Sequence, residues 1–316
     1  MRHPPDVSIV IPCYRSEQSL PDLIERIHQT MSAATVSCEV VMVEDGSPDG
    51  TWKVIGELAL RYPFVRGIRL MRNYGQHNAL LCGIRAARGE TIVTIDDDLQ
   101  NPPEEIPRLL SKFREGYDVV YGTPQKEAHG FLRDLASQLT KLVLQKSMGA
   151  ATARNISAYR VFRTRLRDAF ADYRGSFVSV DVLLTWGGAR FTAIPVKNDP
   201  RTIGASNYTL YKLIAHSLNM MTGFGTAPLQ LASLLGFLFT LIGGVTFLYV
   251  IGSYLLHGSP VQGFPFLASA IAIFSGAQLF ALGIMGEYLA RVHARTIDRP
   301  SFTIDSTTGE ENSDAR

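Results

Sequence analysis

The sequence has few cysteines: only Cys13, Cys38 and Cys82 occur in 316 residues. Their number is odd and no C-x-x-C pair is present, which argues against a disulfide framework and against a zinc site. We interpret them as reduced thiols of a cytosolic domain. Residues 1–6 carry charges and prolines and lead directly into a strand-like segment, so the chain also lacks the pattern of a signal peptide.

Neither of two common phosphate-binding loops is present. No G-x-G-x-x-G follows the first strand-like segment and no G-x-x-x-x-G-K-[ST] occurs anywhere, which argues against dinucleotide-binding and P-loop proteins. The net charge of +2 is too small for a typical nucleic-acid-binding domain, which carries a dense basic face. We therefore expect no nucleic-acid partner, and we expect bound phosphates to be held by a metal ion and arginines.

Two long segments, 229–256 and 264–286, contain no Asp, Glu, Lys or Arg. Each is longer than the roughly 20 residues that cross a bilayer core. The segment 257–263 between them contains Gly and Pro, which predicts a hairpin of two transmembrane helices. The alternative is a pair of buried helices in a soluble core, but soluble helices of this length normally keep a polar face.

Positive charges flank this hairpin and are absent from its connection. The cations before it are Lys197, Arg201 and Lys212, and those after it are Arg291, Arg295 and Arg299. By the positive-inside bias, both ends are predicted to be cytoplasmic. The expected organisation is a cytosolic catalytic domain at 1–205, a juxtamembrane amphipathic segment at 206–225, two transmembrane helices within 226–290 and a polar cytosolic tail at 291–316. The tail is expected to be disordered from Ser306.

Strand and helix patterns alternate before the hairpin. Apolar residues at helical spacing predict a helix over 20–31, and short apolar runs predict strands over 7–12, 39–43, 65–70, 91–95 and 118–121. This alternation predicts an α/β fold with a mostly parallel sheet and helices on both faces. Ligands of such sheets bind beyond the carboxyl ends of the strands, which is where Asp45 and Asp96 fall.

Three successive carboxylates, Asp96, Asp97 and Asp98, follow one of these strands. Such a cluster is costly unless a cation compensates it, and a hard divalent ion such as Mg²⁺ prefers oxygen ligands. The alternative is a solvated acidic loop that caps the next helix through Pro102 and Glu104. The position at a strand end favours the metal site.

A second acidic group, at 44–51, also follows a strand. Asp45 is a candidate acceptor of hydrogen bonds from a base or ribose. The alternative is a Gly-Ser-Pro-Asp-Gly turn with Asp49 or Thr51 as helix N-cap. Taken alone, this segment favours the turn.

Four segments in order, 10–14, 43–51, 72–79 and 96–105, resemble the family 2 glycosyltransferases with the GT-A fold, and within them the polyprenyl-phosphate glycosyltransferases. The resemblance extends from Val7 to about Arg295. It implies an inverting, metal-dependent transfer of a sugar from a nucleotide-sugar to polyprenyl (undecaprenyl) phosphate at the cytosolic face of the inner (plasma) membrane. The product would supply cell-envelope glycan or lipid modification. The resemblance also implies a homotetramer.

The resemblance assigns roles to particular residues. It implies a nucleotide-sugar pocket at Pro12, Tyr14, Glu17, Asp45, Asp96 and Asp97. It implies a Mg²⁺ or Mn²⁺ ion at Asp96, Asp98 and Gln100. It implies lipid-phosphate binding at Arg133, Arg201, Ser206 and Tyr208, and catalytic roles for Asp96, Asp98, Arg133 and Arg201. The chain departs from the family pattern at Arg15-Ser16, at 123–126 and at Asn207, so the sugar and nucleotide are not predicted.

The expected acceptor needs little help from a general base. The second pKa of a phosphate monoester is about 6, so the group is mostly ionised at neutral pH. This favours in-line displacement with inversion, driven by positioning and electrostatics. Segments 131–148 and 208–221 mix apolar stripes with cations, which predicts interfacial helices or, alternatively, helices packed on the core.

Two rival functions are weaker. A family 2 synthase that elongates a polysaccharide would normally carry a Q-x-x-R-W motif and more membrane spans, neither of which is seen. A non-catalytic membrane scaffold would not need Asp45, Asp96, Asp98 and Gln100, which are all present.

Overall fold

The computed structural model describes residues 4–124, 155–175, 178–199, 227–257, 264–297 and 300–308. The chain divides into two compact units. The first comprises Met1–Ile214 together with Asp298–Arg316, and the second comprises Ala215–Ile297. The first unit is therefore assembled from two parts of the sequence.

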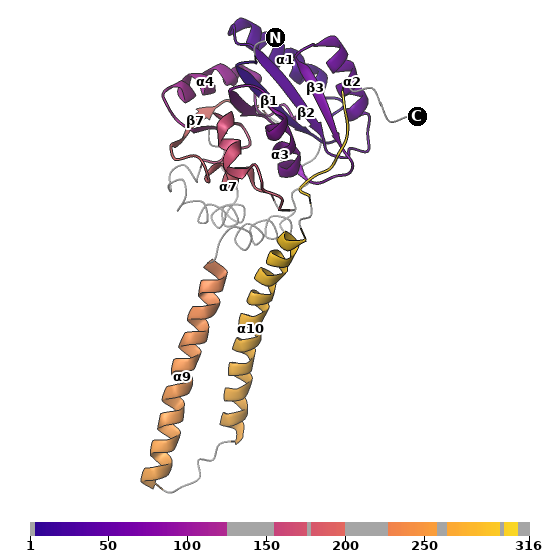
Figure 1. The fold of residues 1–316 in the computed structure, drawn as a ribbon. Helices are drawn as coiled ribbons and strands as arrows, with labels where there is room; N and C mark the ends of the chain where they lie inside the picture. The colour runs from indigo at the N-terminus through magenta and orange to yellow at the C-terminus, as the bar shows by residue number, and fades with distance from the viewer. Residues whose placement is uncertain are drawn as a thin grey trace. The chain divides into compact units, whose positions relative to one another are not determined.

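The first unit contains one eight-stranded sheet in the order β7-β5-β6-β4-β1-β2-β3-β8 (Figure 1). The strands are β1 Val7–Cys13, β2 Cys38–Glu44, β3 Val65–Leu70, β4 Thr91–Thr94, β5 Val119–Pro124, β6 Arg160–Arg163, β7 Phe191–Val196 and β8 Ile304–Thr307. The pairs β1–β2, β1–β4, β2–β3 and β5–β7 are parallel. The pairs β3–β8, β4–β6 and β5–β6 are antiparallel. The predicted mostly parallel sheet is confirmed.

Helices cover both faces of this sheet, as predicted. Side chains of α1 Leu20–Ala33, α2 Thr51–Arg61 and α4 Ile106–Arg114 share one core with the strands, and η1 Pro103–Glu105 leads into α4. Side chains of α3 Gln76–Ala86, η2 Thr164–Phe170 and α7 Val180–Leu184 share the other core. In α1 the buried residues Leu20, Leu23, Ile24, Ile27 and Met31 follow helical spacing, so one apolar stripe faces the sheet.

The second unit is a pair of long helices, α9 Ala227–His257 and α10 Phe264–Thr296. They pack along each other (Figure 1), with the rings of Phe239 and Phe274 edge to face at 6.0 Å between centroids. Helices form at both segments where the sequence predicts them, and α10 continues beyond the predicted end at 286. Among the residues that the structure describes, no helix combines the length and the apolar character needed to cross a membrane.

The segment after α10 differs from the polar tail that the sequence predicts. β8 returns to the first unit and pairs with β3. Beyond it, the Thr308 N–H donates to the Gly67 carbonyl at 3.0 Å, and the Thr308 hydroxyl accepts from the Gly67 N–H at 2.8 Å. The expectation of disorder from Ser306 is wrong for residues 306–308. Pairing at a sheet edge uses backbone groups, so this polar segment needs no apolar pattern to join the sheet.

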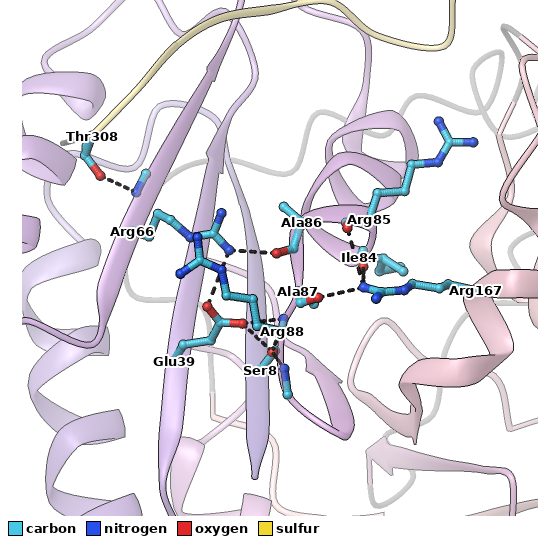
Figure 2. A network of polar contacts seen from close by, with 12 residues as sticks. Ser8, Glu39, Arg66, Ile84, Arg85, Ala86, Ala87, Arg88, Arg167 and Thr308 are labelled. Carbon is cyan, nitrogen blue, oxygen red and sulfur yellow. Dashed lines mark hydrogen bonds and ion pairs between the residues drawn. The ribbon is translucent and has the colours of Figure 1, made fainter. Parts of the chain in front are cut away.

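A polar network lies at the amino ends of β1, β2 and β4 (Figure 2). The buried Glu39 carboxylate accepts from the Ser8 hydroxyl at 2.7 Å and from the Arg88 N–H at 2.6 Å. Its other oxygen lies 3.4 Å from Arg66. Arg167 donates to carbonyls at the end of α3, which have no partner within the helix. The network fixes the connection between α3 and β4.

Candidate active site at the carboxyl ends of the strands

The acidic residues that the sequence analysis identified lie at the carboxyl ends of the parallel strands. Asp45 follows β2 and Asp96 to Asp98 follow β4, and both strands run parallel to β1. The Asp97 carboxylate accepts from the Tyr14 N–H at 3.1 Å and from the Ser16 hydroxyl. The structure therefore joins the segment after β1 to the acidic cluster after β4.

Asp96 is partly exposed and is held from one side by α3. Its Oδ1 accepts from the Gln76 side-chain amide at 2.7 Å. Burial by the surrounding protein, with the negative charges of Asp98 and Asp97, raises the pKa of Asp96 to about 7. Burial also raises the pKa of Asp97, against the hydrogen bond from Ser16. The ionised cluster is therefore unfavourable without a compensating cation.

Asp98 and Gln100 flank a residue with an unusual backbone conformation. The Gln100 N–H donates to Asp98 Oδ1 at 3.2 Å, and Leu99 between them has a φ of 62°. Non-glycine residues with positive φ are rare in proteins, and those that exist are concentrated at functional sites. Two carboxylates and one amide oxygen, from Asp96, Asp98 and Gln100, have the chemistry that suits Mg²⁺ or Mn²⁺.

The described ranges hold no group of three or more His, Cys, Asp or Glu side chains arranged for a metal ion. The donor set of Asp96, Asp98 and Gln100 contains only two such residues, so the metal would need waters or donor phosphates as further ligands, as Mg²⁺ commonly has. The residues therefore fit a divalent ion shared with a phosphate substrate better than a closed structural metal site.

Asp45 faces inward, which neither of the two interpretations from sequence predicted. It is only 3% exposed. One oxygen accepts from the Tyr74 N–H at 2.6 Å and the other from the Gly75 N–H at 2.8 Å. Burial raises the pKa of Asp45, and these two hydrogen bonds oppose the rise. The neighbouring turn forms, with Asp49 accepting from the Thr51 hydroxyl at 2.6 Å, but the N-cap of α2 is Gly50 and not Asp49 or Thr51 as expected.

The other residues assigned to the nucleotide pocket lie at the same carboxyl ends of the strands. Pro12 is buried in β1, and Tyr14 is 41% exposed with the Arg15 guanidinium 5.5 Å from its ring centroid. Glu17 accepts from the Gly50 N–H at 2.8 Å. Tyr14 is therefore exposed at this end of the sheet. Glu17 connects the segment after β1 to the start of α2.

A buried ion pair behind the acidic cluster was missed by the sequence analysis. Arg160 is 1% exposed and pairs with Asp181. Its Nε donates to the Thr94 hydroxyl at 3.0 Å, and the Tyr121 hydroxyl donates to Asp181 at 3.1 Å. One feature of the sequence indicates this pair: a charged residue interrupts the apolar run 159–162. Ser16 and Gln76 were also missed as partners of the carboxylates.

Several predicted residues lie outside the described part of the chain. They are Arg133, Arg201, Ser206 and Tyr208, and the segments 131–148 and 208–221 lie wholly outside it as well. The lipid-phosphate site therefore stays a prediction, as does half of the predicted catalytic set. The described half is the acidic cluster with its partners on α3 and after β1.

The raised pKa of Asp96 predicts a pH-dependent stability. Because the folded pKa is about 7 and the ordinary value is 3.8, the folded state binds the proton more tightly. The free energy of unfolding should therefore fall as pH rises from about 4 to 7. In chelator at pH 8, Asp96→Asn is expected to be more stable than the wild type, by up to about 4 kcal/mol. Urea unfolding at pH 5 and pH 8 measures this.

Asp49→Asn is the matched control, because its effect has the opposite sign. Burial alone would raise the pKa of Asp49, but hydrogen bonds from Ser47 and Thr51 lower it. Its charge thus stabilises the fold above the ordinary pKa, and Asp49→Asn should lose stability at pH 8. If Asp96→Asn and Asp49→Asn changed the free energy of unfolding equally at pH 8, the charge on Asp96 would not be unfavourable to the fold.

The chain is similar to known proteins over most of its length. The model of "Glycosyl transferase family 2" matches residues 8–174. The undecaprenyl-phosphate 4-deoxy-4-formamido-L-arabinose transferase of Proteus mirabilis is 34% identical over 306 residues, covering 96% of this chain and 94% of that protein. The transferase of the same name from Shewanella sediminis is 37% identical over 318 residues, covering 98% and 95%. Among solved structures, mannosyl-3-phosphoglycerate synthase from Rubrobacter xylanophilus is similar over 69% of this chain and 72% of its own, with a TM-score of 0.49 and 18% identity.

Proposed function

Because this chain belongs to glycosyl transferase family 2, we propose that it transfers a sugar from a nucleotide-sugar to polyprenyl phosphate, with undecaprenyl phosphate as the acceptor. The acidic cluster that Asp96, Asp97 and Asp98 form at the strand ends carries this proposal. The names of relatives that share nearly the whole length of the chain support the acceptor. The product would supply lipid-linked sugar for cell-envelope glycan or lipid modification.

The donor would bind at the carboxyl ends of β1, β2 and β4. Its nucleotide would lie along the wall formed by Pro12, Tyr14, Glu17, Asp45, Asp96 and Asp97. Asp96, Asp98 and Gln100 would hold Mg²⁺ or Mn²⁺, which supplies a Lewis acid for the charge of the leaving nucleoside diphosphate. The repulsion among the Asp96, Asp97 and Asp98 carboxylates supports a cation at this place.

The acceptor phosphate would approach the anomeric carbon from the side opposite the leaving group. We assign Arg133, Arg201, Ser206 and Tyr208 to the lipid phosphate on the resemblance alone, because they lie outside the described residues. A phosphate that is already ionised attacks without a strong general base. The chain's own contribution is then to align the two substrates and balance their charges, which predicts inversion at the anomeric carbon.

A polyprenyl chain stays in the bilayer, so the enzyme must hold its site at the membrane surface. We assign α9 and α10 to a membrane hairpin, with the first unit and both termini in the cytoplasm at the inner membrane. No helix among the described residues is long and apolar enough to span a membrane. The membrane assignment therefore depends on the absence of charged residues from 229–256 and 264–286. Exposed apolar side chains such as Leu241 and Val245 also support it. We keep the homotetramer as a prediction from the resemblance.

One experiment tests the transfer directly. Membranes that contain the protein are incubated with undecaprenyl phosphate and a panel of nucleotide-sugars, and the glycolipid is identified by mass spectrometry. We expect one donor to give a lipid-linked sugar and excess chelator to abolish the product. Turnover that is unchanged in chelator would contradict the metal, and absence of lipid product with every donor would contradict the acceptor.

The hairpin is tested by placing charge in the middle of α9. Leu241→Arg with Val245→Arg is expected to disfavour membrane insertion, because each arginine costs about 2.5–3.5 kcal/mol at the centre of a spanning helix. The protein should then appear in the supernatant after alkaline washing of membranes. Leu60→Arg on α2 is the control, since Leu60 is 89% exposed in the first unit. Release of the wild type by the same wash would contradict the hairpin.

A further inference from the structure

Arg69 on β3 lies between two carboxylates that belong to different strands. Its Nε is 3.3 Å from the Glu44 carboxylate at the end of β2, and its Nη1 is 3.9 Å from the Asp305 carboxylate on β8. Glu44 is directly opposite Arg69 in the parallel pair of β2 and β3, and Ser306 is opposite Arg69 in the pair of β3 and β8. Arg69 therefore connects the last strand of the described chain to the end of β2.

Glu44 is buried, so its charge depends on these partners. Its side chain is only 1% exposed. Burial raises the pKa of Glu44, while the hydrogen bond from the Ser47 N–H and the charge of Arg69 lower it. A buried carboxylate that loses its cation keeps an uncompensated charge, which it relieves by rearranging or by taking up a proton. The Arg69 side chain is 43% exposed, so a shorter side chain at this position leaves no buried cavity.

The Glu44 carboxylate also fixes the turn that follows β2. It accepts from the Ser47 N–H, and the Ser47 hydroxyl accepts from the Arg15 N–H at 2.7 Å. Arg15 has a φ of 59°, a conformation that a non-glycine residue keeps only where its surroundings hold it. Glu44 and Ser47 are therefore part of what holds the segment after β1 in this conformation.

The segment after β1 carries the exposed part of the proposed nucleotide wall. The Tyr14 N–H donates to Asp97 at 3.1 Å, and the Ser16 N–H donates to the Thr51 hydroxyl at 2.9 Å. Together with the N–H of the residue between them, three successive N–H groups are bound by side chains from three other parts of the chain. The set of contacts that begins at Arg69 therefore ends at this wall.

We propose that Arg69 is a positioning residue of the donor site, which acts through Glu44 and the turn at 44–47 to hold residues 14–16 in the nucleotide wall. This inference rests on the proposed function, because it concerns the same donor site. It adds β8 to the parts of the chain that shape the site, although β8 follows both long helices in the sequence. Asp45, next to Glu44, keeps its own place in the wall. Loss of Arg69 is expected to weaken nucleotide binding more than it slows transfer.

Arg66 on the same strand provides the matched control. It pairs with Glu39, the other glutamate of β2, at 3.4 Å (Figure 2). That pair belongs to the network at the amino ends of the strands, away from the donor site. Arg66→Met and Arg69→Met therefore each separate an arginine of β3 from a glutamate of β2, and only the second change concerns the nucleotide wall.

The full-length protein in detergent is titrated by calorimetry with UDP, GDP and CDP, each in the presence of Mn²⁺. For the nucleotide that the wild type binds most tightly, Arg69→Met should raise Kd by about tenfold, because binding must then also order the turn and residues 14–16. Arg66→Met should stay within about twofold of the wild type, since distant sites act independently.

Glu44→Gln removes the same ion pair from its other side and leaves no buried charge, so it tests the proposal even if Arg69→Met does not fold. It should raise Kd by about three- to tenfold, and the double variant should be within about twofold of the weaker-binding single variant, because residues in one contact are not additive. Arg69→Lys should recover part of the affinity, since it restores the charge but not the shape of the guanidinium.

Transfer rates separate positioning from a general loss of structure. The kcat of Arg69→Met at saturating donor should stay within about threefold of the wild type, because Gln76 holds Asp96 independently of the turn. Hydrogen exchange at the N–H groups of Arg15 and Ser47 gives a readout that needs no nucleotide. Both groups should exchange faster in Arg69→Met, and at the wild-type rate in Arg66→Met.

Several results would overturn the proposal. They are no binding of any of the three nucleotides to the wild type, an unchanged Kd in Arg69→Met and Glu44→Gln, an equal rise of Kd in Arg66→Met, multiplicative effects in the double variant, or unchanged exchange at Arg15 and Ser47 in Arg69→Met. If binding and exchange respond as expected but the wild type makes no lipid product with any donor, the proposed function is wrong and the positioning role of Arg69 remains.

Discussion

Asp98→Asn is expected to reduce sugar transfer by at least about 100-fold at any concentration of Mg²⁺ or Mn²⁺. The change removes a negative charge from the oxygen set of Asp96, Asp98 and Gln100 while keeping the size of the side chain. Electrostatic groups that act on charge developing in a transition state commonly account for losses of 10²–10³. Initial rates measured over a titration of each metal separate weaker metal binding from slower transfer.

Glu104→Gln is the matched control for that prediction. Glu104 belongs to the same acidic segment, but its carboxylate pairs with Arg26 at 2.8 Å. We expect its transfer rate to stay within about threefold of the wild type, since an exposed ion pair contributes little. If Asp98→Asn kept the activity of Glu104→Gln, the acidic segment would be the solvated helix cap that the sequence also allowed.

Arg160→Met is expected to destabilise the first unit by about 3–5 kcal/mol, which is the usual effect of removing one partner from a buried ion pair. The substitution leaves the Asp181 carboxylate buried, with the Tyr121 hydroxyl as its remaining partner. Methionine has a similar length and is apolar, so a cavity contributes little. Urea unfolding of the detergent-solubilised protein, followed by fluorescence of Trp52 and Trp186, measures the change.

The combination of Arg160→Met, Asp181→Leu and Tyr121→Phe should recover most of that loss. Replacing a whole buried polar group by apolar side chains is often neutral, because no unpaired charge remains. A triple variant as unstable as Arg160→Met would mean that the contacts of Arg160 with Thr94 and the Ala158 carbonyl, rather than the pair with Asp181, hold this region together.

The central strands were predictable because their sequences carry the pattern themselves. β3 has the predicted bounds, β1 is longer by one residue at its end, and β2 is longer by one residue at each end. β1 and β2 are short, mostly apolar runs that are buried on both faces, and in β3 the apolar residues are buried although Arg66 and Arg69 interrupt them. β6, β7 and β8 were not predicted: β6 contains Arg160 and Arg163, β7 is mostly half-buried, and β8 is polar. These segments form strands because they pair with neighbouring strands, and the residues of those neighbours lie elsewhere in the sequence.

The site was predictable in its location and less so in its contacts. Carboxylates after buried parallel strands must meet at one edge, so the proximity of Asp45 and the Asp96 cluster followed from the pattern. The direction in which Asp45 points did not, because it depends on Tyr74 and Gly75, which lie 29 and 30 residues away. The bond between Gln76 and Asp96 joins residues that are 20 apart on different elements, which no local periodicity reveals.

The return of the chain to β3 has a consequence for biosynthesis. β8 is made only after both long helices, so during translation the outer edge of β3 has no strand beside it. Synthesis at about 5–20 residues per second would leave that edge open for many seconds. Unpaired sheet edges are the places where partly made chains pair wrongly with one another. Residues 304–308 therefore complete a sheet that began at the first strand, and a chain that stops after α10 would leave its edge at β3 unpaired.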